Sequence, residues 1–170
     1  MPTLHVCALS RLPETVAATG ARHVVTLINV GTPVTRPASI AEADHLFVGI
    51  SDITDAIDGH VLPDEAHVRR LLDFVRAWPR EQPLVIHCYA GISRSTAAAF
   101  ITACALRPDR DEAEIARDLR QASSSATPNR RLVAVADALL ERNGRMISAV
   151  AAIGRGADAF EGEPFSVTID

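Results

Sequence analysis

Residues 83–100 constrain the fold of this chain more than any other stretch, because an apolar run, a short loop and an alanine-rich run follow in direct succession. Leu84 to Ile86 are apolar and partly β-branched, which predicts a buried strand of a parallel sheet. Thr96 to Ala105 is rich in alanine with apolar residues at helical spacing, which predicts a buried helix. Cys88 and Arg94 lie between these elements, with five residues separating them.

The spacing of Cys88 and Arg94 is suited to binding an anion. A five-residue loop between a strand and a helix can turn its backbone N–H groups inward, and the positive end of the helix adds to their field. Gly91 permits the backbone conformations that such a curl requires. The planar guanidinium of Arg94 matches two phosphate oxygens, and the positive surroundings favour the nucleophilic thiolate form of Cys88. The loop therefore predicts attack by a cysteine on the phosphorus of a phosphate monoester.

The nine residues His87-Cys-Tyr-Ala-Gly-Ile-Ser-Arg-Ser95, named here the signature loop, resemble a known pattern. It is the H-C-x-x-G-x-x-R-[ST] loop of the cysteine-dependent protein tyrosine and dual-specificity phosphatases, and every defined position matches. Within this loop, the sequence Ala-Gly-x-Ser-Arg-Ser most resembles the loops of the dual-specificity phosphatases. The resemblance implies an α/β fold, with a central, mostly parallel sheet of about four to five strands flanked by helices and a C-terminal helical cluster.

The same resemblance implies a function. The chain is expected to be a phosphatase that acts on phosphotyrosine in proteins or peptides. The sequence leaves open whether it is specific for tyrosine or also acts on phosphoserine and phosphothreonine. The reaction would pass through a phosphocysteine intermediate and need no cofactor. Two alternatives stay open. One is a catalytically weak module that binds phosphate or a phosphopeptide. The other is a phosphoinositide phosphatase, which the uncharged loop residues Tyr89, Ala90, Ile92 and Ser93 disfavour.

The resemblance also implies roles for single residues. Cys88 is the expected nucleophile, and Ser95 is expected to hydrogen-bond its sulfur, to cap the helix, or both. His87 would order the loop through hydrogen bonds without acting as a base. Phosphate binding is expected from Arg94 and from the residues between it and the cysteine, which are Tyr89, Ala90, Gly91, Ile92 and Ser93. Asn129, in a Pro-Asn pair like one beside the signature loop of dual-specificity enzymes, is expected to cap a helix in preference to binding substrate.

The leaving oxygen needs a proton donor, which in this family is an aspartate upstream of the cysteine. Asp52, Asp55 and Asp58 lie in the polar loop after the strand predicted over 45–50. Asp52 follows that strand directly and is the preferred general acid, with Asp55 second. All three could instead be ordinary loop or capping residues.

The remaining sequence predicts a single domain over residues 1–170. Strands are expected over 4–9, 23–30 and 45–50, and helices over 12–19 and from an N-cap at Asp64 to about 78. Asp109 and Glu112 are typical of a capping box that opens a helix to about 122. A further helix is expected to follow Asn129 and end at Gly144, with another over 146–153 and a glycine-rich tail from about residue 155.

Composition limits the partners and the cellular location that are expected for this chain. A hydrophobic fraction of 48% and a charged fraction of 22% are ordinary for a soluble globular protein, and the net charge of −4 argues against nucleic acid or an anionic membrane as the main partner. All basic residues are arginine, which is typical of a GC-rich bacterial genome. The sequence has no apolar run of membrane-spanning length and no signal-peptide layout, so a cytoplasmic location is expected. Oligomeric state is left open.

Three cysteines without a C-x-x-C pair argue against a disulfide framework, and the six scattered histidines predict no metal site. Cys7 and Cys104 are expected to be small core residues. The alternative is that one of them traps oxidised Cys88 as a reversible disulfide.

Overall fold

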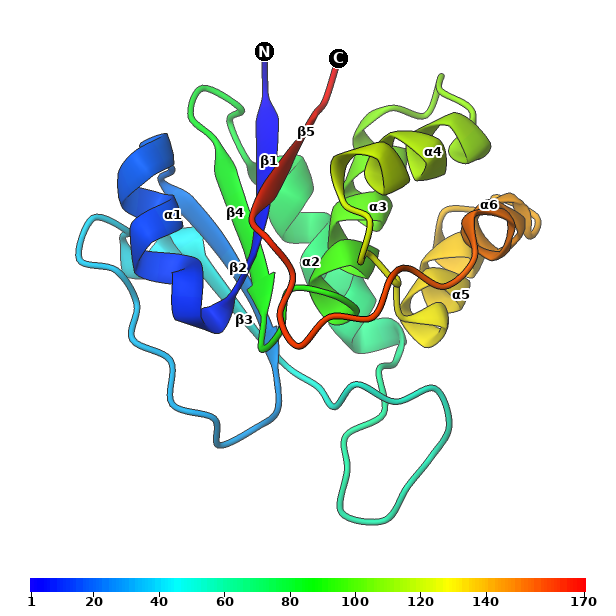
Figure 1. Ribbon diagram of the computed structural model, residues 1–170, viewed down its shortest axis with the longest axis horizontal. Helices are drawn as coiled ribbons and strands as arrows, with labels where there is room; N and C mark the ends of the chain where they lie inside the picture. Colours follow the sequence, from blue (N-terminus) through cyan, green and yellow to red (C-terminus); the bar gives the residue numbers. More distant parts are fainter.

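The computed structural model describes residues 1–170, and its five strands form one sheet (Figure 1). In chain order the strands are β1 Thr3–Ala8, β2 His23–Ile28, β3 His45–Gly49, β4 Leu84–Cys88 and β5 Phe165–Thr168. Their order across the sheet is β3-β2-β4-β1-β5; β1 to β4 are parallel and β5 runs antiparallel to β1. The expected mostly parallel sheet is confirmed. Because parallel strands end at the same edge, the loops after β2, β3 and β4 meet there.

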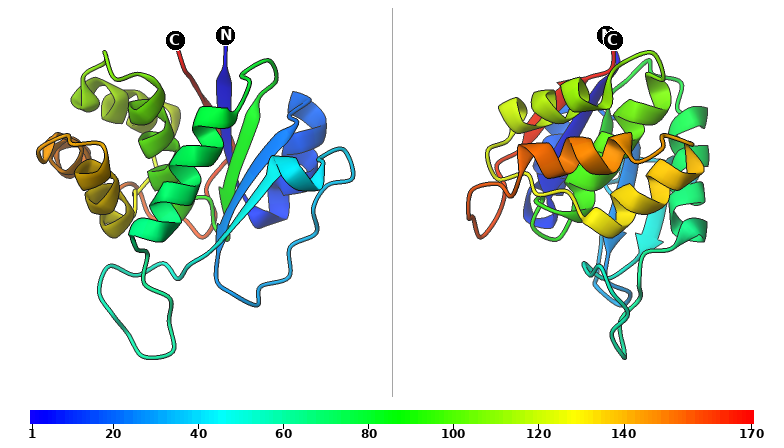
Figure 2. Two further views of the ribbon diagram at one scale, coloured as in Figure 1. Left: turned by 180° about the vertical axis from the view of Figure 1, so that it is seen from behind. Right: turned by 90° about the vertical axis from the view of Figure 1, so that its right-hand side faces the viewer.

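Six helices cover the two faces of the sheet unequally (Figure 1 and Figure 2). One face carries α1 alone, Leu12–Thr19. The other face carries α2 Glu65–Ala77, α3 Arg94–Leu106, α4 Glu112–Ala122, α5 Arg130–Leu139 and α6 Arg145–Ile153. The expected C-terminal helical cluster is confirmed by the packing of α4 and α5 against α6. None of these helices combines the length and the apolar character needed to cross a membrane.

The two elements beside the signature loop are the most deeply buried. All five residues of β4 are buried, and so are twelve residues of α3. The alanines of α3 leave room for α2, α4 and α5 to pack around it, which places α3 inside a main core of 32 residues. A smaller cluster of seven residues lies under α1. The signature loop is therefore anchored at both ends by parts of the chain that cannot move without opening the core.

The cap of α4 differs from the predicted box of Asp109 and Glu112, and that prediction was wrong. Asp111 caps the helix, because its carboxylate accepts hydrogen bonds from two N–H groups of the first turn. Asp109 pairs with Arg107 instead, at 2.9 Å. The carboxylate of Glu112 is buried and binds Arg142 at 2.7 Å. A buried ion pair between residues far apart in sequence overrides the local spacing.

The end of α5 was also predicted wrongly. The helix ends at Leu139 and does not continue to Asn143-Gly144. Gly144, with a φ of +83°, is the residue that precedes α6. The carboxylate of Asp137 accepts hydrogen bonds from the N–H groups of Gly144, at 2.8 Å, and Met146, at 2.9 Å. These bonds turn the chain from α5 into α6 earlier than the glycine signal indicates.

Residues 154–164, named here the C-terminal strap, and β5 replace the predicted glycine-rich tail. The strap runs along the carboxyl edge of the sheet from α6 to β5 (Figure 1, orange to red). The N–H of Gly156 donates to the Thr127 hydroxyl at 3.0 Å, and the N–H of Gly162 donates to the carbonyl of Ala90 at 2.8 Å. The tail prediction was wrong because these contacts are long-range and leave no local pattern.

Candidate active site

The signature loop connects β4 to α3 at the carboxyl edge of the sheet (Figure 1). Gly91, at its centre, has a φ of +72°, where a side chain is disfavoured. A Cβ at this position would lie 2.8 Å from the backbone nitrogen of Ala8. The glycine is therefore required both by the curl of the loop and by its close approach to the end of β1.

The sulfur of Cys88 lies at the bottom of this curl, with 2% of the residue exposed. It accepts a hydrogen bond from the N–H of Gly91 at 3.3 Å, and it lies 3.1 Å from the Oγ of Ser95. Both groups are therefore placed to donate hydrogen bonds to the sulfur. The structure thus brings together Cys88, Gly91 and Ser95 as the sequence predicts.

The guanidinium of Arg94 is held over the same loop by one of its nitrogens. Its Nη1 donates to the Oδ1 of Asn29 at 2.6 Å and to the carbonyl of Ile50 at 2.8 Å. Its Nε is buried and has no partner, although only 7% of the residue is exposed. A buried N–H without an acceptor is costly. The free Nε therefore indicates a place where a ligand oxygen binds.

The loop backbone offers more donors of this kind. The N–H groups of Ala90, Ile92 and Ser93 donate to no carbonyl within the chain. Together with the Nε of Arg94, they form a set of unpaired donors within the signature loop. Such a set matches the equatorial oxygens of a phosphoryl group.

Asn29 is a functional residue that the sequence reasoning missed. It follows β2, so its position at the carboxyl edge could have been inferred from the strand pattern. Nothing local in the sequence, however, shows that it meets Arg94, which is 65 residues away.

Asp52 is the only one of the three candidate acids that contacts the signature loop. Its Oδ1 accepts hydrogen bonds from the hydroxyl of Ser93 at 2.7 Å and from the Nδ2 of Asn129 at 2.8 Å. Asp55 accepts a bond from its neighbour Thr54, and Asp58 is exposed. Position therefore favours Asp52.

Asn129 is buried and uses both ends of its amide. Its Oδ1 accepts the N–H of Leu132, which caps α5 as predicted, while its Nδ2 donates to Asp52 and to the carbonyl of Ile53. It therefore positions the acid candidate, and it also lines the cavity beside Asp52. A direct contact of Asn129 with substrate stays a prediction.

His87 is fully buried, so it acts on the site through its hydrogen bonds and not by direct contact from the surface. Its Nδ1 lies 3.1 Å from the carbonyl of Cys88, and its Nε2 lies 2.7 Å from the hydroxyl of Thr26. A carbonyl only accepts, so the proton lies on Nδ1 and Thr26 donates to Nε2. Burial lowers the pKa of His87 to about 4. It is a neutral residue that positions the carbonyl of the nucleophile.

Backbone N–H groups from other segments donate hydrogen bonds to two carbonyl groups of the signature loop. The carbonyl of Ile92 accepts the N–H of Thr127 at 2.9 Å, and that of Ala90 accepts the N–H of Gly162 in the strap. Tyr89 points outward, with 60% of the residue exposed. Loop and strap therefore form one rim around the site.

A cavity of about 460 Å³ adjoins this rim beside Asp52 and Ser93. It lies between the loop after β3 and the start of α5. Its lining combines apolar side chains with two arginines: Ile53, Ile57, Pro128, Val150, Arg130 and Arg155. The cavity is large enough to receive a side chain that flanks a residue bound at Cys88.

Cys7 and Cys104 are buried free thiols, as expected of small core residues. Burial raises the pKa of Cys7 to about 11 and that of Cys104 to about 12, so both are protonated at neutral pH. Cys7 lies on β1, beside His87 of β4, whereas Cys104 lies within α3. Their role as redox partners of Cys88 stays a prediction.

Comparison with known proteins agrees with this site. The family model for protein-tyrosine phosphatases matches residues 58–135, which include the whole signature loop. No curated protein sequence matches the chain. Solved structures match its fold at low identity, and such a likeness shows the fold alone.

Three of these structures illustrate how the fold is shared at low sequence identity. DUSP15 has a TM-score of 0.64 at 13% identity, covering 90% of this chain and 91% of that chain. The human tyrosine phosphatase-like serine/threonine/tyrosine-interacting protein has a TM-score of 0.65 at 14% identity, covering 84% and 94%. PTPMT1 in complex with PI(5)P has a TM-score of 0.61 at 15% identity, covering 90% and 95%. The chain is therefore similar to phosphatases of the tyrosine and dual-specificity type, in sequence over residues 58–135 and in fold over most of its length.

Proposed function

We propose that this chain hydrolyses phosphate monoesters of proteins, on phosphotyrosine and also on phosphoserine and phosphothreonine, through a phosphocysteine intermediate. One observation carries the proposal. The buried Nε of Arg94 has no partner, and it lies in the same loop as Cys88 and the free N–H groups. These donors suit a dianionic phosphoryl group placed in line with a thiolate.

In the first step, the thiolate of Cys88 attacks the phosphorus and the bond to the leaving oxygen breaks. The Nε of Arg94 and the loop N–H groups hold the equatorial oxygens, where charge collects in the transition state. Asp52 gives its proton to the leaving oxygen. Without this proton an alkoxide or phenoxide would have to depart, at a cost on the order of 100-fold or more in rate.

The hydrogen bonds of Asp52 support its role as acid. Both donors, Ser93 and Asn129, bind the same oxygen, Oδ1. A proton on Asp52 therefore belongs on Oδ2, which is left to face a leaving group. Ser93 ties the acid to the loop that binds the phosphate, so acid and nucleophile keep a fixed separation.

In the second step, the carboxylate of Asp52 takes a proton from water while the water oxygen attacks the phosphorus. The bond between phosphorus and sulfur breaks, and the electron pair returns to Cys88. Ser95, at 3.1 Å, donates a hydrogen bond to the departing thiolate. Inorganic phosphate leaves and the thiolate is restored. Each step uses only side chains of this chain and water.

The test is hydrolysis of p-nitrophenyl phosphate in the presence of a chelator. Wild type, Cys88→Ser and Asp52→Ala are compared across pH. We expect turnover that Cys88→Ser abolishes and that loses its basic limb in Asp52→Ala. Full activity in Cys88→Ser would refute the mechanism. Vanadate binding without any wild-type turnover would instead support the phosphate-binding module.

A further inference from the structure

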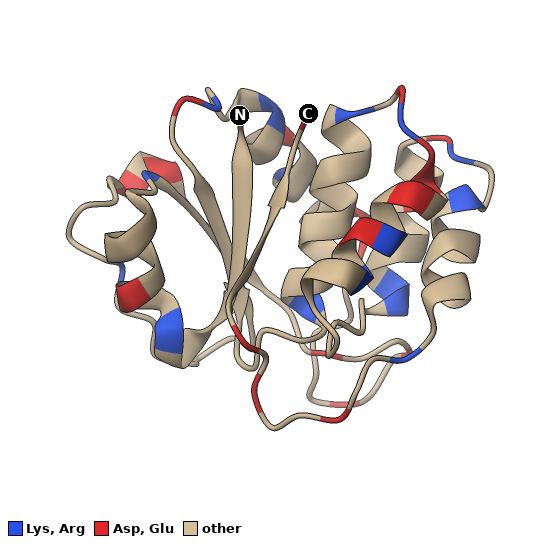
Figure 3. Ribbon diagram, turned by 45° about the horizontal axis from the view of Figure 1, so that its top comes forward, with Lys and Arg blue, Asp and Glu red and all other residues tan.

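Two segments flank the signature loop, and both are acidic. The loop of residues 51–64 reaches it through the bond of Asp52 to Ser93, and the C-terminal strap reaches it through Gly162. Together the segments hold seven acidic residues and one arginine. The acidic residues, named here the acidic rim, are Asp52, Asp55, Asp58, Asp64, Asp158, Glu161 and Glu163. Figure 3 shows acidic positions, in red, along the loops below the sheet.

The basic residues nearby do not cancel this charge. Arg155 pairs with Asp158 at 2.6 Å on the strap. Arg36 lies in the loop after β2, and Arg130 and Arg131 begin α5. Arg11 also lies close enough to Glu161 and Glu163 to interact with their charges. With all five arginines counted, an excess of two negative charges remains around the mouth. The signature loop itself adds only Arg94, which is buried and faces the phosphate site.

The same segments expose apolar side chains that the core does not use. Phe160, on the strap, is 93% exposed, and Tyr89 of the signature loop is 60% exposed. Ile57 and Val61 are exposed on the loop of residues 51–64, and Ile57 also lines the 460 Å³ cavity beside Asp52. Apolar groups gathered around a catalytic mouth are typical of a surface that contacts another protein.

We propose that the substrate is a protein segment in which basic and apolar residues flank the phosphorylated residue. This inference rests on the proposed function and names its substrate class. Arginine or lysine side chains of the segment face the acidic rim, and an apolar neighbour enters the cavity or packs on Phe160. A membrane that carries anionic lipids meets the same rim with like charge, so phosphoinositides in a bilayer are disfavoured.

The first arm of the test compares substrates. Two phosphotyrosine peptides of equal length and apolar content carry arginines or aspartates beside the phosphorylated residue. Phosphatidylcholine vesicles containing a phosphatidylinositol monophosphate form the third substrate. We expect kcat/KM for the arginine peptide to exceed that for the aspartate peptide about five-fold at low salt, with a smaller ratio at higher ionic strength. We expect the vesicles to be the poorest substrate.

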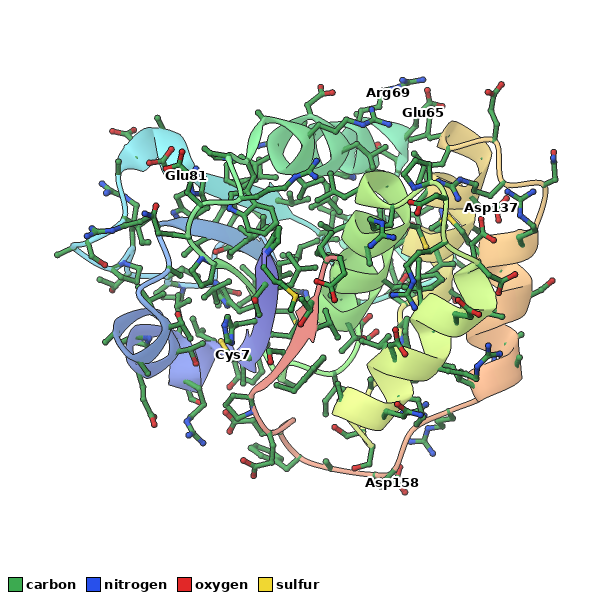
Figure 4. All side chains as sticks on the ribbon, turned by 90° about the horizontal axis from the view of Figure 1, so that it is seen from above. Cys7, Glu65, Arg69, Glu81, Asp137 and Asp158 are labelled. Carbon is green, nitrogen blue, oxygen red and sulfur yellow. The ribbon has the colours of Figure 1, made fainter.

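The second arm locates the effect. Asp158→Asn with Glu163→Gln removes two charges from the strap, and Asp73→Asn with Glu81→Gln removes two charges from α2 and the loop before β4. Figure 4 labels Asp158, on the outer side of the strap, and Glu81, in the loop before β4. The ratio between the two peptides within each variant is the readout. We expect it to fall at least two-fold in the strap variant and to stay at its wild-type value in the control.

A binding measurement distinguishes failure of this inference from failure of the proposed function. The same peptides are titrated into Cys88→Ser, followed by fluorescence anisotropy, so a preference is measured even if wild type shows no turnover. Tighter binding of the arginine peptide supports the inference in either case. Equal or tighter binding of the aspartate peptide, faster hydrolysis of the vesicles, or an equal loss of preference in the control variant would overturn it.

Discussion

At the scale of single residues, supporting side chains and carbonyl groups orient the reactive side chains of the site through hydrogen bonds. Asn29 and the carbonyl of Ile50 take one nitrogen of Arg94, which leaves Nε for phosphate. Ser93 and Asn129 take one oxygen of Asp52, which leaves the other for the leaving group. Each reactive side chain is thus oriented by having its remaining atoms occupied, and the supporting residues should matter nearly as much as the reactive ones.

Asn29→Ala should weaken phosphate and vanadate binding and lower kcat/KM about ten-fold, because Arg94 loses a charge-assisted hydrogen bond. Steady-state kinetics with p-nitrophenyl phosphate and vanadate inhibition measure both effects. Asn29→Asp is the matched control, since it keeps an acceptor for Nη1 and should retain most of the activity. Unchanged vanadate affinity in Asn29→Ala would contradict the orienting role.

Gly91→Ala should abolish most activity, since the new Cβ would lie 2.8 Å from backbone atoms of β1. Gly20→Ala is the matched control, because Gly20 has a similar φ of +69° with nothing within 4 Å of its Cβ position. We expect the control to cost only about 1 kcal/mol of unfolding free energy and no activity. Urea denaturation and turnover assays compare the two, and similar losses in both would refute the close-approach argument.

At the scale of elements, the C-terminal strap contacts the signature loop directly. The N–H of Gly162 in the strap donates a hydrogen bond to the carbonyl of Ala90. The strap then leads into β5, which pairs with β1, and β1 lies beside β4 in the sheet. A Cβ on Gly162 would meet the carbonyl oxygen of Gly91 at 2.8 Å. The strap therefore supports the signature loop from the side opposite to α3.

Gly162→Ala should push the strap away from the signature loop. We expect a loss of about 1–3 kcal/mol in unfolding free energy, together with reduced turnover of p-nitrophenyl phosphate. Ala157→Ser, at an exposed position of the same strap, should leave stability unchanged. If Gly162→Ala lost stability but kept full turnover, the strap would support the fold and not the loop.

Local signals predicted the elements well, and long-range contacts account for what they missed. The helix over 12–19, the cap at Asp64 and the strand before the signature loop all follow from residues close in sequence. The signature loop identified Cys88, Arg94 and Ser95 because its chemistry lies within nine residues. Asn29 and the strap act on that loop from 65 and 72 residues away. No spacing rule connects such positions, so only the fold shows them.

At the scale of the whole molecule, stability should depend on pH through a buried histidine. Burial holds the pKa of His87 at about 4, below its ordinary value of 6.5. Above pH 6.5 the imidazole of His87 is neutral in both the folded and the unfolded state. As the pH falls from 6.5 to 4, the unfolded state gains a proton that the folded state does not bind, so stability is lost.

The expected loss over that interval is about 3 kcal/mol for wild type. Urea denaturation at a series of pH values measures it. His87→Gln removes the titrating group, so the variant should start from lower stability but show a flatter dependence on pH. His5 and His45, whose pKa values burial also lowers, contribute the remaining slope. An equally steep dependence in His87→Gln would assign the effect to other groups, which include Glu112 because its pKa is also lowered.

The position of the strap fixes the order in which parts of the candidate site leave the ribosome. A ribosome releases the nucleophile, the arginine and the acid long before it releases the strap and β5, because both follow α6 along the chain. A nascent chain thus carries every reactive group while its catalytic loop still lacks one of its supports. Under the proposed function, a product cut short by a premature stop codon after α6 is therefore expected to be a poor catalyst despite an intact signature loop.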